Sequence, residues 1–293
     1  MKKRLISSIL IIALVFSLYC VRKYVLDDYN YNEQNGEIST VVDVEGQLTV
    51  HYIDVGQGDS CFIEFPDGET MLIDGGVSKY ADVVTGFISS LGYKSIDYLV
   101  ATHGDSDHIG GLYKVFEEFE VKNCYTSVVP SNTKTYRNFK GAVKNEGIDC
   151  QTPFAGDFII DEENLDVEVV GPFENVSRKD TNDASLVILI SFYEYDFLFT
   201  GDASYEMLES YNIGDIEVLK ASHHGSRTGV SYDLISVLSP EYSVISVGES
   251  NSYNHPHNET LDLLENSKIY MTSESGTISI DCDGNSLSFT TEK

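Results

Sequence analysis

The feature that most constrains this chain is an apolar run that ends directly in a cluster of metal-binding side chains. Residues 96–102 form a strand-like segment, after which the sequence reads His103-Gly-Asp105-Ser-Asp107-His108. Four potential metal ligands therefore fall within six residues, and two glycines follow and let the next helix begin tightly against this loop. Imidazole together with carboxylate suits Zn, Mn or Fe, and the high share of oxygen ligands favours Mn or another hard ion. The alternative is a solvated acidic turn that carries two ordinary histidines.

Two later apolar runs end in the same kind of residue. Asp202 closes the run 196–202, where a buried carboxylate is unfavourable unless a cation or a hydrogen-bond donor meets it. His223 and His224 close the run that begins at residue 216. Each signal is weak alone, but together with the first loop they indicate one site built from loops at strand ends.

The alternation of short apolar runs with amphipathic segments predicts an α/β domain. The simplest division is one domain over residues 47–293, without internal repeats. The main expected strands lie at 48–55, 61–65, 70–76, 96–103, 165–170, 185–192, 196–202, 216–224 and 242–248, and the expected helices at 80–91, from about 107, at 132–146 and at 259–266.

The amino terminus, residues 1–26, predicts a membrane segment. Two lysines and an arginine precede 17 uncharged residues (5–21), which as a helix span roughly 25 Å. No A-x-A-like cleavage site precedes Tyr24, so we expect an uncleaved single-pass anchor in the cell membrane with the rest of the chain extracytoplasmic. The alternatives are a cleaved signal peptide, which gives a secreted protein, and a buried helix. Residues 27–46 are polar and predict a linker.

Composition narrows the classes of function. The net charge is −28, and residues 27–293 hold all 47 acidic residues but only 14 of the 19 basic ones. A surface this acidic argues against broad, unspecific binding of nucleic acid, which depends on Lys and Arg. The five cysteines are odd in number and contain no CxxC pair, so they give no zinc-finger or redox signature and do not resemble a disulfide scaffold.

One helix is an exception to the acidic surface. Lys134, Arg137, Lys140 and Lys144 fall within about 120° of one helix face, which we call the basic ridge, while Phe139 and its neighbours form a separate apolar stripe. The plain interpretation is a solvated face with ordinary lysines. The functional hypothesis is a track for a nucleic-acid backbone.

Seven motifs in order carry a resemblance to a known family. They read HYIDVGQGDS, LIDGG, THGDSDHIGG, NDASLVI, FTGD, LKASHHGS and NHPHNET, and they cover about residues 47–293. In this order they resemble the metallo-β-lactamase-fold hydrolases, and most of all the carboxyl-terminal domain of the competence DNA-uptake channel protein. The resemblance implies a four-layer αββα sandwich with a metal site at one edge. One apolar segment cannot form the multi-span channel, so we expect a stand-alone relative on a single anchor.

The resemblance also implies a ligand set for one or two divalent ions, Mn²⁺ or Zn²⁺. His103 and Asp105 would bind the first ion and Asp107 and His108 the second, with Asp202 bridging them. His223 would complete the second site, and Asp74 of LIDGG would hold the motif loop by hydrogen bonds.

Two departures from the family pattern concern the first site. Asp105 stands where most of the superfamily has histidine, and the histidine of the third motif is absent. Thr181-Asn182-Asp183 occupies that part of the chain, so Asp183 is a possible extra ligand. The first site is therefore expected to be oxygen-rich, and weak or empty in isolation.

The remaining polar motifs suggest roles around the metals. Two cations would activate a bridging water that attacks a phosphate ester, with Asp107 orienting it. His255 is the candidate acid or oxyanion partner. His224, His257 and Asp59 are candidates for supporting roles; the alternatives are that His257 caps or packs at a helix start and that the glycine-rich turn before Asp59 is purely structural.

Three functions follow from these patterns. The first is a metal-dependent phosphodiesterase or nuclease that acts on DNA, which can be single-stranded. Arg137, Lys140 and Lys144 are the candidates for binding this substrate. The second is a cell-surface phosphodiesterase for a small or wall-linked ester such as phosphocholine on teichoic acid, because an acidic surface suits a cationic choline group. The third is a non-catalytic binding module. The pattern makes no prediction of oligomeric state.

Overall fold

The computed structural model describes residues 46–293. The chain divides into two units, residues 1–43 and 44–293, and the predicted anchor and nearly all of the predicted linker lie outside the described residues. Within the described range, none of the helices combines the length and the apolar character that a membrane span requires.

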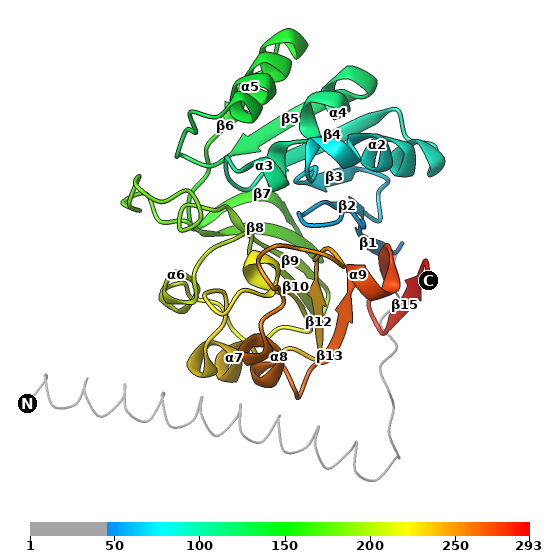
Figure 1. Cartoon of the computed structure of the whole chain (residues 1–293). Helices are drawn as coiled ribbons and strands as arrows, with labels where there is room; N and C mark the ends of the chain where they lie inside the picture. Colours follow the sequence, from blue (N-terminus) through cyan, green and yellow to red (C-terminus); the bar gives the residue numbers. More distant parts are fainter. Residues whose placement is uncertain (1–45) are drawn as a thin grey trace, which may run out of the picture. The chain divides into compact units, whose positions relative to one another are not determined.

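Two sheets form the centre of the domain (Figure 1). The first has the order β15-β14-β1-β2-β3-β4-β5-β6 and the second the order β13-β12-β11-β10-β9-β8-β7. The first sheet contains β1 (Leu48–Tyr52), β2 (Cys61–Glu64), β3 (Thr70–Ile73), β4 (Ser95–Ala101), β5 (Glu120–Thr126), β6 (Cys150–Gln151), β14 (Ile278–Cys282) and β15 (Leu287–Thr291). The second contains β7 (Asp157–Glu162), β8 (Leu165–Gly171), β9 (Val187–Phe192), β10 (Tyr195–Phe199), β11 (Val218–Lys220), β12 (Tyr242–Ile245) and β13 (Lys268–Met271).

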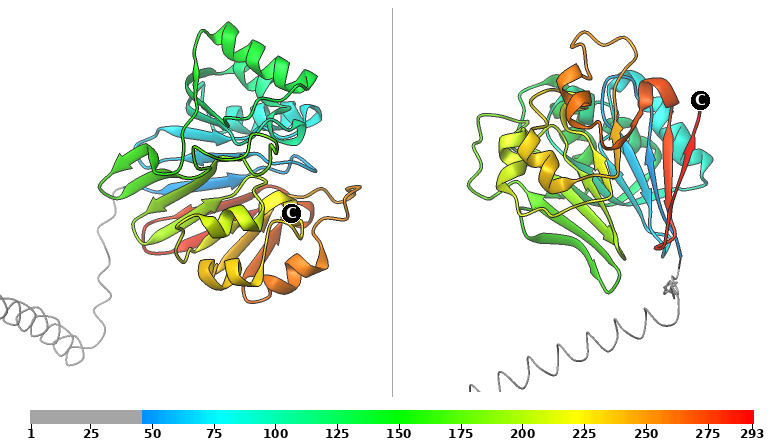
Figure 2. Two further views of the ribbon diagram at one scale, coloured as in Figure 1. Left: turned by 90° about the vertical axis from the view of Figure 1, so that its left-hand side faces the viewer. Right: turned by 90° about the horizontal axis from the view of Figure 1, so that it is seen from below.

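Three apolar cores show that the layers follow the predicted αββα order. The largest lies between the sheets and joins residues such as Val50 of β1 to Phe197 of β10. A second core packs the first sheet against α2 (Ala81–Ser90), α3 (Ser106–Ile109), α4 (Leu112–Glu118) and α5 (Lys134–Glu146). A third packs the other sheet against α6 (Tyr205–Ser210), α7 (Tyr232–Leu238) and α8 (Asn258–Leu263), on the opposite side of the sandwich (Figure 2). A last short helix, α9 (Thr272–Ser275), follows β13. The predicted sandwich is confirmed.

The strand directions explain why the polar motifs meet. β3, β4 and β5 are parallel neighbours in one sheet, and β10, β11 and β12 are parallel neighbours in the other. Their carboxyl ends therefore lie at one edge of each sheet, where sites form in α/β folds. β5 was not predicted, and the other five strands end a few residues earlier than predicted, so Asp74, His103, Asp202 and His223 stand beyond the strands.

α5 forms as the apolar stripe predicts. Phe139 and Val143 are buried, and the four basic side chains of the ridge lie on exposed positions. The side chain of Thr133 caps the helix by accepting a hydrogen bond from the Tyr136 N–H at 3.1 Å, and Gly147 ends it in the left-handed region.

A disulfide joins β5, which precedes α5 in the chain, to β6, which follows it. It links Cys124 to Cys150, which are direct partners in the strand register. Cys61 and Cys282 are buried free thiols. This pair could not be recognised from the cysteine spacing, because the two residues lie 26 positions apart and become adjacent only through strand pairing.

Candidate metal centre

Asp202 lies at the centre of the site, in the loop after β10. Its side chain is 4% exposed, and four histidine Nε2 atoms surround its two oxygens. The distances are 3.8 Å for His103, 3.2 Å for His108, 3.6 Å for His223 and 3.9 Å for His224. This is the central position predicted for a bridging carboxylate.

Hydrogen bonds on the far side of two rings fix the nitrogen that faces the site. His108 Nδ1–H donates to Asp74 Oδ2 at 2.7 Å, and His224 Nδ1–H donates to the Ser246 carbonyl at 3.0 Å. Each ring therefore directs Nε2 at Asp202, the orientation typical of metal-bound histidine. Burial lowers the pKa of both rings, but Asp202 and the neighbouring carboxylates raise it above its usual value, to about 9 for His224, so a bound cation would displace the proton from Nε2. Asp74 also accepts hydrogen bonds from Thr102 at 2.6 and 2.9 Å, which matches the holding role predicted for it.

The donor set fits a divalent cation. Five buried polar atoms of the site make no hydrogen bond: His103 Nε2, His108 Nε2, His224 Nε2, Asp59 Oδ1 and Asp202 Oδ1. Buried polar atoms are nearly always satisfied, and several orphaned atoms that converge on one point indicate a missing cationic partner. Burial and the neighbouring His108 lower the pKa of His103 to about 3, which keeps this ring neutral as a ligand must be.

The geometry differs from the prediction for the two adjacent histidines. Among the described residues, the group that contains Asp107 and His108 is completed by His224, whose Nε2 lies 3.4 Å from Asp107 Oδ2. His223 contacts Asp202 from a side chain that is 32% exposed. Both histidines have a positive φ, 50° and 55°, and this turn directs the ring of His224 inward.

Asp105 and Asp183 belong to the predicted first site. Asp105 Oδ2 lies 3.9 Å from His103 Nε2, and Asp105 accepts a hydrogen bond from Thr181 at 3.2 Å. Asp183 instead accepts a hydrogen bond from Ser204 at 2.6 Å and is in none of the candidate metal clusters of residues 46–293. Asp105 is absent from these clusters as well, and the cluster that contains His103 is completed by His108 and Asp202. The geometry therefore offers Asp183 no support, while Asp105 stands near His103 at the pocket wall.

A buried ion pair supports the centre from behind. Asp59 pairs with Lys220, a lysine only 2% exposed, and its carboxylate lies 3.2 Å from His224 Nδ1 and 3.7 Å from His108 Nδ1. Burial alone would raise the pKa of Asp59, but the charges of Lys220 and His224 lower it well below its usual range. Sequence analysis missed Lys220; the signal was a lone lysine inside an apolar strand.

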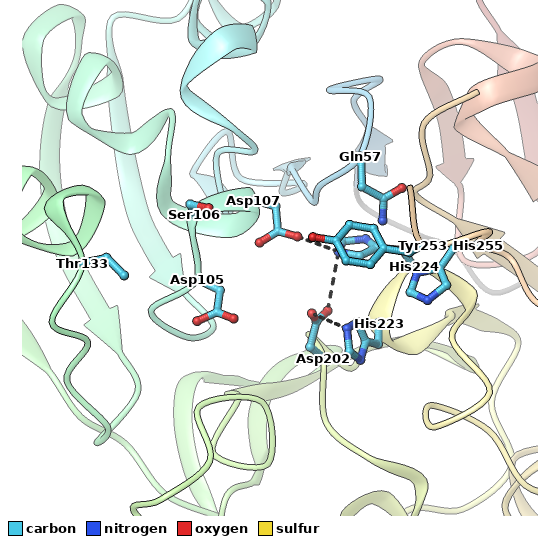
Figure 3. Close-up of a pocket in the computed structure, with 10 residues that line it drawn as sticks. All are labelled: Gln57, Asp105, Ser106, Asp107, Thr133, Asp202, His223, His224, Tyr253 and His255. Carbon is cyan, nitrogen blue, oxygen red and sulfur yellow. Dashed lines mark ion pairs between the residues drawn. The ribbon is translucent and has the colours of Figure 1, made fainter. Parts of the chain in front are cut away.

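Part of the cluster, with Asp107, Asp202, His223 and His224, forms the floor of an open pocket of about 360 Å³ (Figure 3). Dashed lines in the figure join Asp107 and Asp202 to the histidines of the 223–224 turn. The ten lining residues are Gln57, Asp105, Ser106, Asp107, Thr133, Asp202, His223, His224, Tyr253 and His255. Sequence reasoning did not predict Gln57, Ser106, Thr133 or Tyr253, although Gln57 stands inside a quoted motif.

The two histidines after residue 254 separate in the structure. His255 lines the pocket, and burial together with His223 and His257 lowers its pKa to about 4. His257 is the residue before α8, and its Nδ1 accepts a hydrogen bond from the Arg227 N–H at 3.1 Å. The geometry places His255 at the site and gives His257 the structural position at the helix start.

The basic ridge does not line the pocket, but α5 begins at its rim. Thr133, which caps this helix, is a lining residue, whereas Arg137, Lys140 and Lys144 lie progressively further along the helix. At 1.5 Å per residue, the ridge extends roughly 15 Å from the first lysine to the last.

Comparisons with known proteins agree with this geometry. Residues 53–249 match the metallo-beta-lactamase superfamily. The chain is 30% identical over 261 residues to ComE operon protein 3 of Bacillus subtilis (strain 168), an alignment that covers 80% of this chain and 33% of that protein. It is 28% identical over 240 residues to Recombination protein 2 of Haemophilus influenzae, which covers 79% and 28%. The chain thus spans about a third of the length of the curated relatives it matches.

A solved structure shares the fold. A CmlA beta-hydroxylase variant aligns with a TM-score of 0.51 at 14% identity, covering 79% of this chain and 53% of that one. At this identity the likeness concerns the fold alone. The family resemblance predicted from the motifs is confirmed by the match over residues 53–249.

Proposed function

The chain belongs to the metallo-beta-lactamase superfamily, and from this premise we propose that it is an extracytoplasmic, metal-dependent phosphodiesterase that cleaves DNA. The observation that carries the proposal is a cluster of five unsatisfied buried donor atoms, of which those of Asp202 and His224 belong to residues that line an open pocket. His103, Asp105 and Asp202 would hold one ion, and Asp107, His108, His224 and Asp202 the other. When bound, divalent cations activate water for attack and neutralise charge that develops on a phosphoryl oxygen.

Two residues of the pocket then have defined tasks. Asp107 combines a place in the ligand cluster with an open position on the pocket wall, and its carboxylate can accept a hydrogen bond from the attacking water. Burial raises the pKa of Asp107, but the close contact with His224 at 3.4 Å and the charge of His108 lower it below its usual value, so it stays ionised at neutral pH. His255 is neutral there, because its pKa is about 4, and serves as an N–H donor to a phosphoryl oxygen.

Three observations favour a nucleic acid outside the cytoplasm. One of the relatives named above is Recombination protein 2, and another similar protein is Competence protein ComA of Neisseria gonorrhoeae. The basic ridge begins at the pocket rim and offers exposed cations on an acidic body. The Cys124–Cys150 disulfide is typical of oxidising compartments, which agrees with the extracytoplasmic side predicted for this domain.

A phosphocholine-type ester is the second candidate. Three of the ten lining residues are aspartates, and residues 27–293 are strongly acidic, so a cationic alcohol would be attracted where a polyanion is repelled.

The test compares two substrates on one enzyme. The full chain, purified in detergent and loaded with Mn²⁺ or Zn²⁺, is assayed with single-stranded DNA and with p-nitrophenylphosphocholine. We expect DNA cleavage that Asp107→Ala abolishes while Asp233→Ala, an exposed acid on α7, retains it. Turnover of the choline ester alone would favour the second candidate, and full activity of Asp107→Ala would refute the site.

A further inference from the structure

Tyr253 is a large aromatic side chain that the structure leaves open at the metal pocket. It is 60% exposed, although it lines the pocket together with His255 (Figure 3). The two rings are stacked, with centroids 5.6 Å apart and an angle of 29° between their planes. His255 therefore covers one face of the tyrosine, and the exposed fraction leaves the rest of the ring for a ligand.

The loop that carries Tyr253 is built to hold it in place. The Asn251 side chain donates to the carbonyls of Gly248 and His255 at 3.0 and 2.7 Å. Its oxygen accepts hydrogen bonds from the N–H groups of Tyr253 and His255 at 3.2 and 2.9 Å. These four hydrogen bonds, made by one side chain, fix the backbone on both sides of Tyr253, so the loop loses little conformational entropy when a ligand packs on the ring.

We propose that Tyr253 is a stacking platform for the nucleobase next to the scissile phosphate, which makes the substrate a nucleotide diester. The inference rests on the proposed function, because the phosphate must lie on the metal floor for the base to reach the rim. Every base presents a π-face, so such a platform accepts DNA of any sequence. A pocket of about 360 Å³ has the size of a site for a small ligand, enough for one nucleotide unit at a time.

The composition of the pocket wall favours a base over a quaternary ammonium group. Sites for choline are cages of several aromatic rings. Among the ten residues that line this pocket, Tyr253 is the one Phe, Tyr or Trp. A single open ring with a histidine behind it suits one-sided stacking of a flat base.

The test measures a preference rather than a rate. The full chain with Mn²⁺ is given a thymidine dinucleotide and its analogue in which one base is replaced by an abasic sugar. We expect the wild type to prefer the base-bearing substrate by about 10- to 100-fold in kcat/KM, and Tyr253→Ala to lose this preference through KM. Tyr253→Phe should keep it, and so should Tyr232→Ala, which removes an exposed tyrosine (75%) that is not among the pocket-lining residues.

Binding of oligothymidylate separates this inference from the proposed function. If no diester is hydrolysed, the proposed function fails. Weaker binding of (dT)₄ to Tyr253→Ala than to Tyr232→Ala would still support the stacking platform. Equal binding of (dT)₄ to the two variants would overturn it. An unchanged dinucleotide preference in Tyr253→Ala overturns the platform as well. A loss confined to p-nitrophenylphosphocholine would assign the ring to a cationic group and overturn the nucleobase.

Discussion

Replacing Lys220 by methionine should destabilise the domain far more than a change at a surface ion pair. The variant keeps most of the volume but leaves the Asp59 carboxylate buried without its lysine. Removing one partner of a buried pair costs about 3–5 kcal/mol. His224 and His108, at 3.2 and 3.7 Å, compensate in part, so we expect about 3 kcal/mol. At about 2–4 °C per kcal/mol for a domain of this size, Tm falls by roughly 6–12 °C.

The assay is urea denaturation of metal-free protein in the presence of a chelator, because bound metal would stabilise the folded state. Arg227→Met is the matched control: Arg227 pairs with Glu259, both side chains are well exposed (59% and 60%), and surface pairs contribute about 0–1 kcal/mol. Asp59→Asn combined with Lys220→Met removes the buried charge and should recover much of the loss. Equal losses for Lys220→Met and Arg227→Met, or no recovery in the double variant, would refute the reasoning.

Three further predictions concern pH, salt and the amino terminus. Burial raises the pKa of Asp97, but hydrogen bonds from Lys122 and Thr70 lower it by more, so the net shift is downward. The stabilisation by this carboxylate is therefore present above the unfolded pKa of about 3.9 and is lost as pH falls through the folded value. In acid denaturation, Asp97→Asn should make the free energy of unfolding depend less steeply on pH in this range. Arg137→Glu with Lys140→Glu should reduce DNA cleavage relative to a small diester and lower the salt slope by about 1.4, whereas Lys94→Glu with Lys268→Glu should not; equal slopes would make the ridge a solvated face. The mature protein should remain in the membrane fraction and keep its first residues in terminal sequencing, and a soluble main product that begins near residue 21 to 30 would contradict the anchor.

The site residues that follow directly after strands were the ones best predicted from the sequence. Apolar runs that end at His103 and Asp202 had to bring these residues together, because parallel strands in both sheets place their carboxyl ends at one edge. The same logic could not distinguish His223 from His224, since both follow β11. The left-handed backbone of both residues selects the inward ring, and no sequence pattern encodes this turn.

Contacts between distant segments account for what the sequence did not predict. Lys220 and Asp59 are 161 residues apart and meet only when the two sheets stack. The disulfide depends on the register of β5 and β6. Tyr253 and Thr133 lie in loops, where periodicity carries no information, and their position at the pocket follows from the hydrogen bonds of Asn251 and from the start of α5.

Metal binding by Asp202→Asn tests the central claim most directly. After removal of metal, the wild type and the variant are dialysed against Mn²⁺ or Zn²⁺, and bound metal is measured by mass spectrometry beside the control Asp233→Ala. The account predicts one or two ions per chain in the wild type and the control, and a loss of metal in Asp202→Asn. The amide of the variant is a neutral and weaker ligand for cations that His103, His108 and His224 would help to hold. Equal metal content in wild type and Asp202→Asn, or none in the wild type, would contradict it.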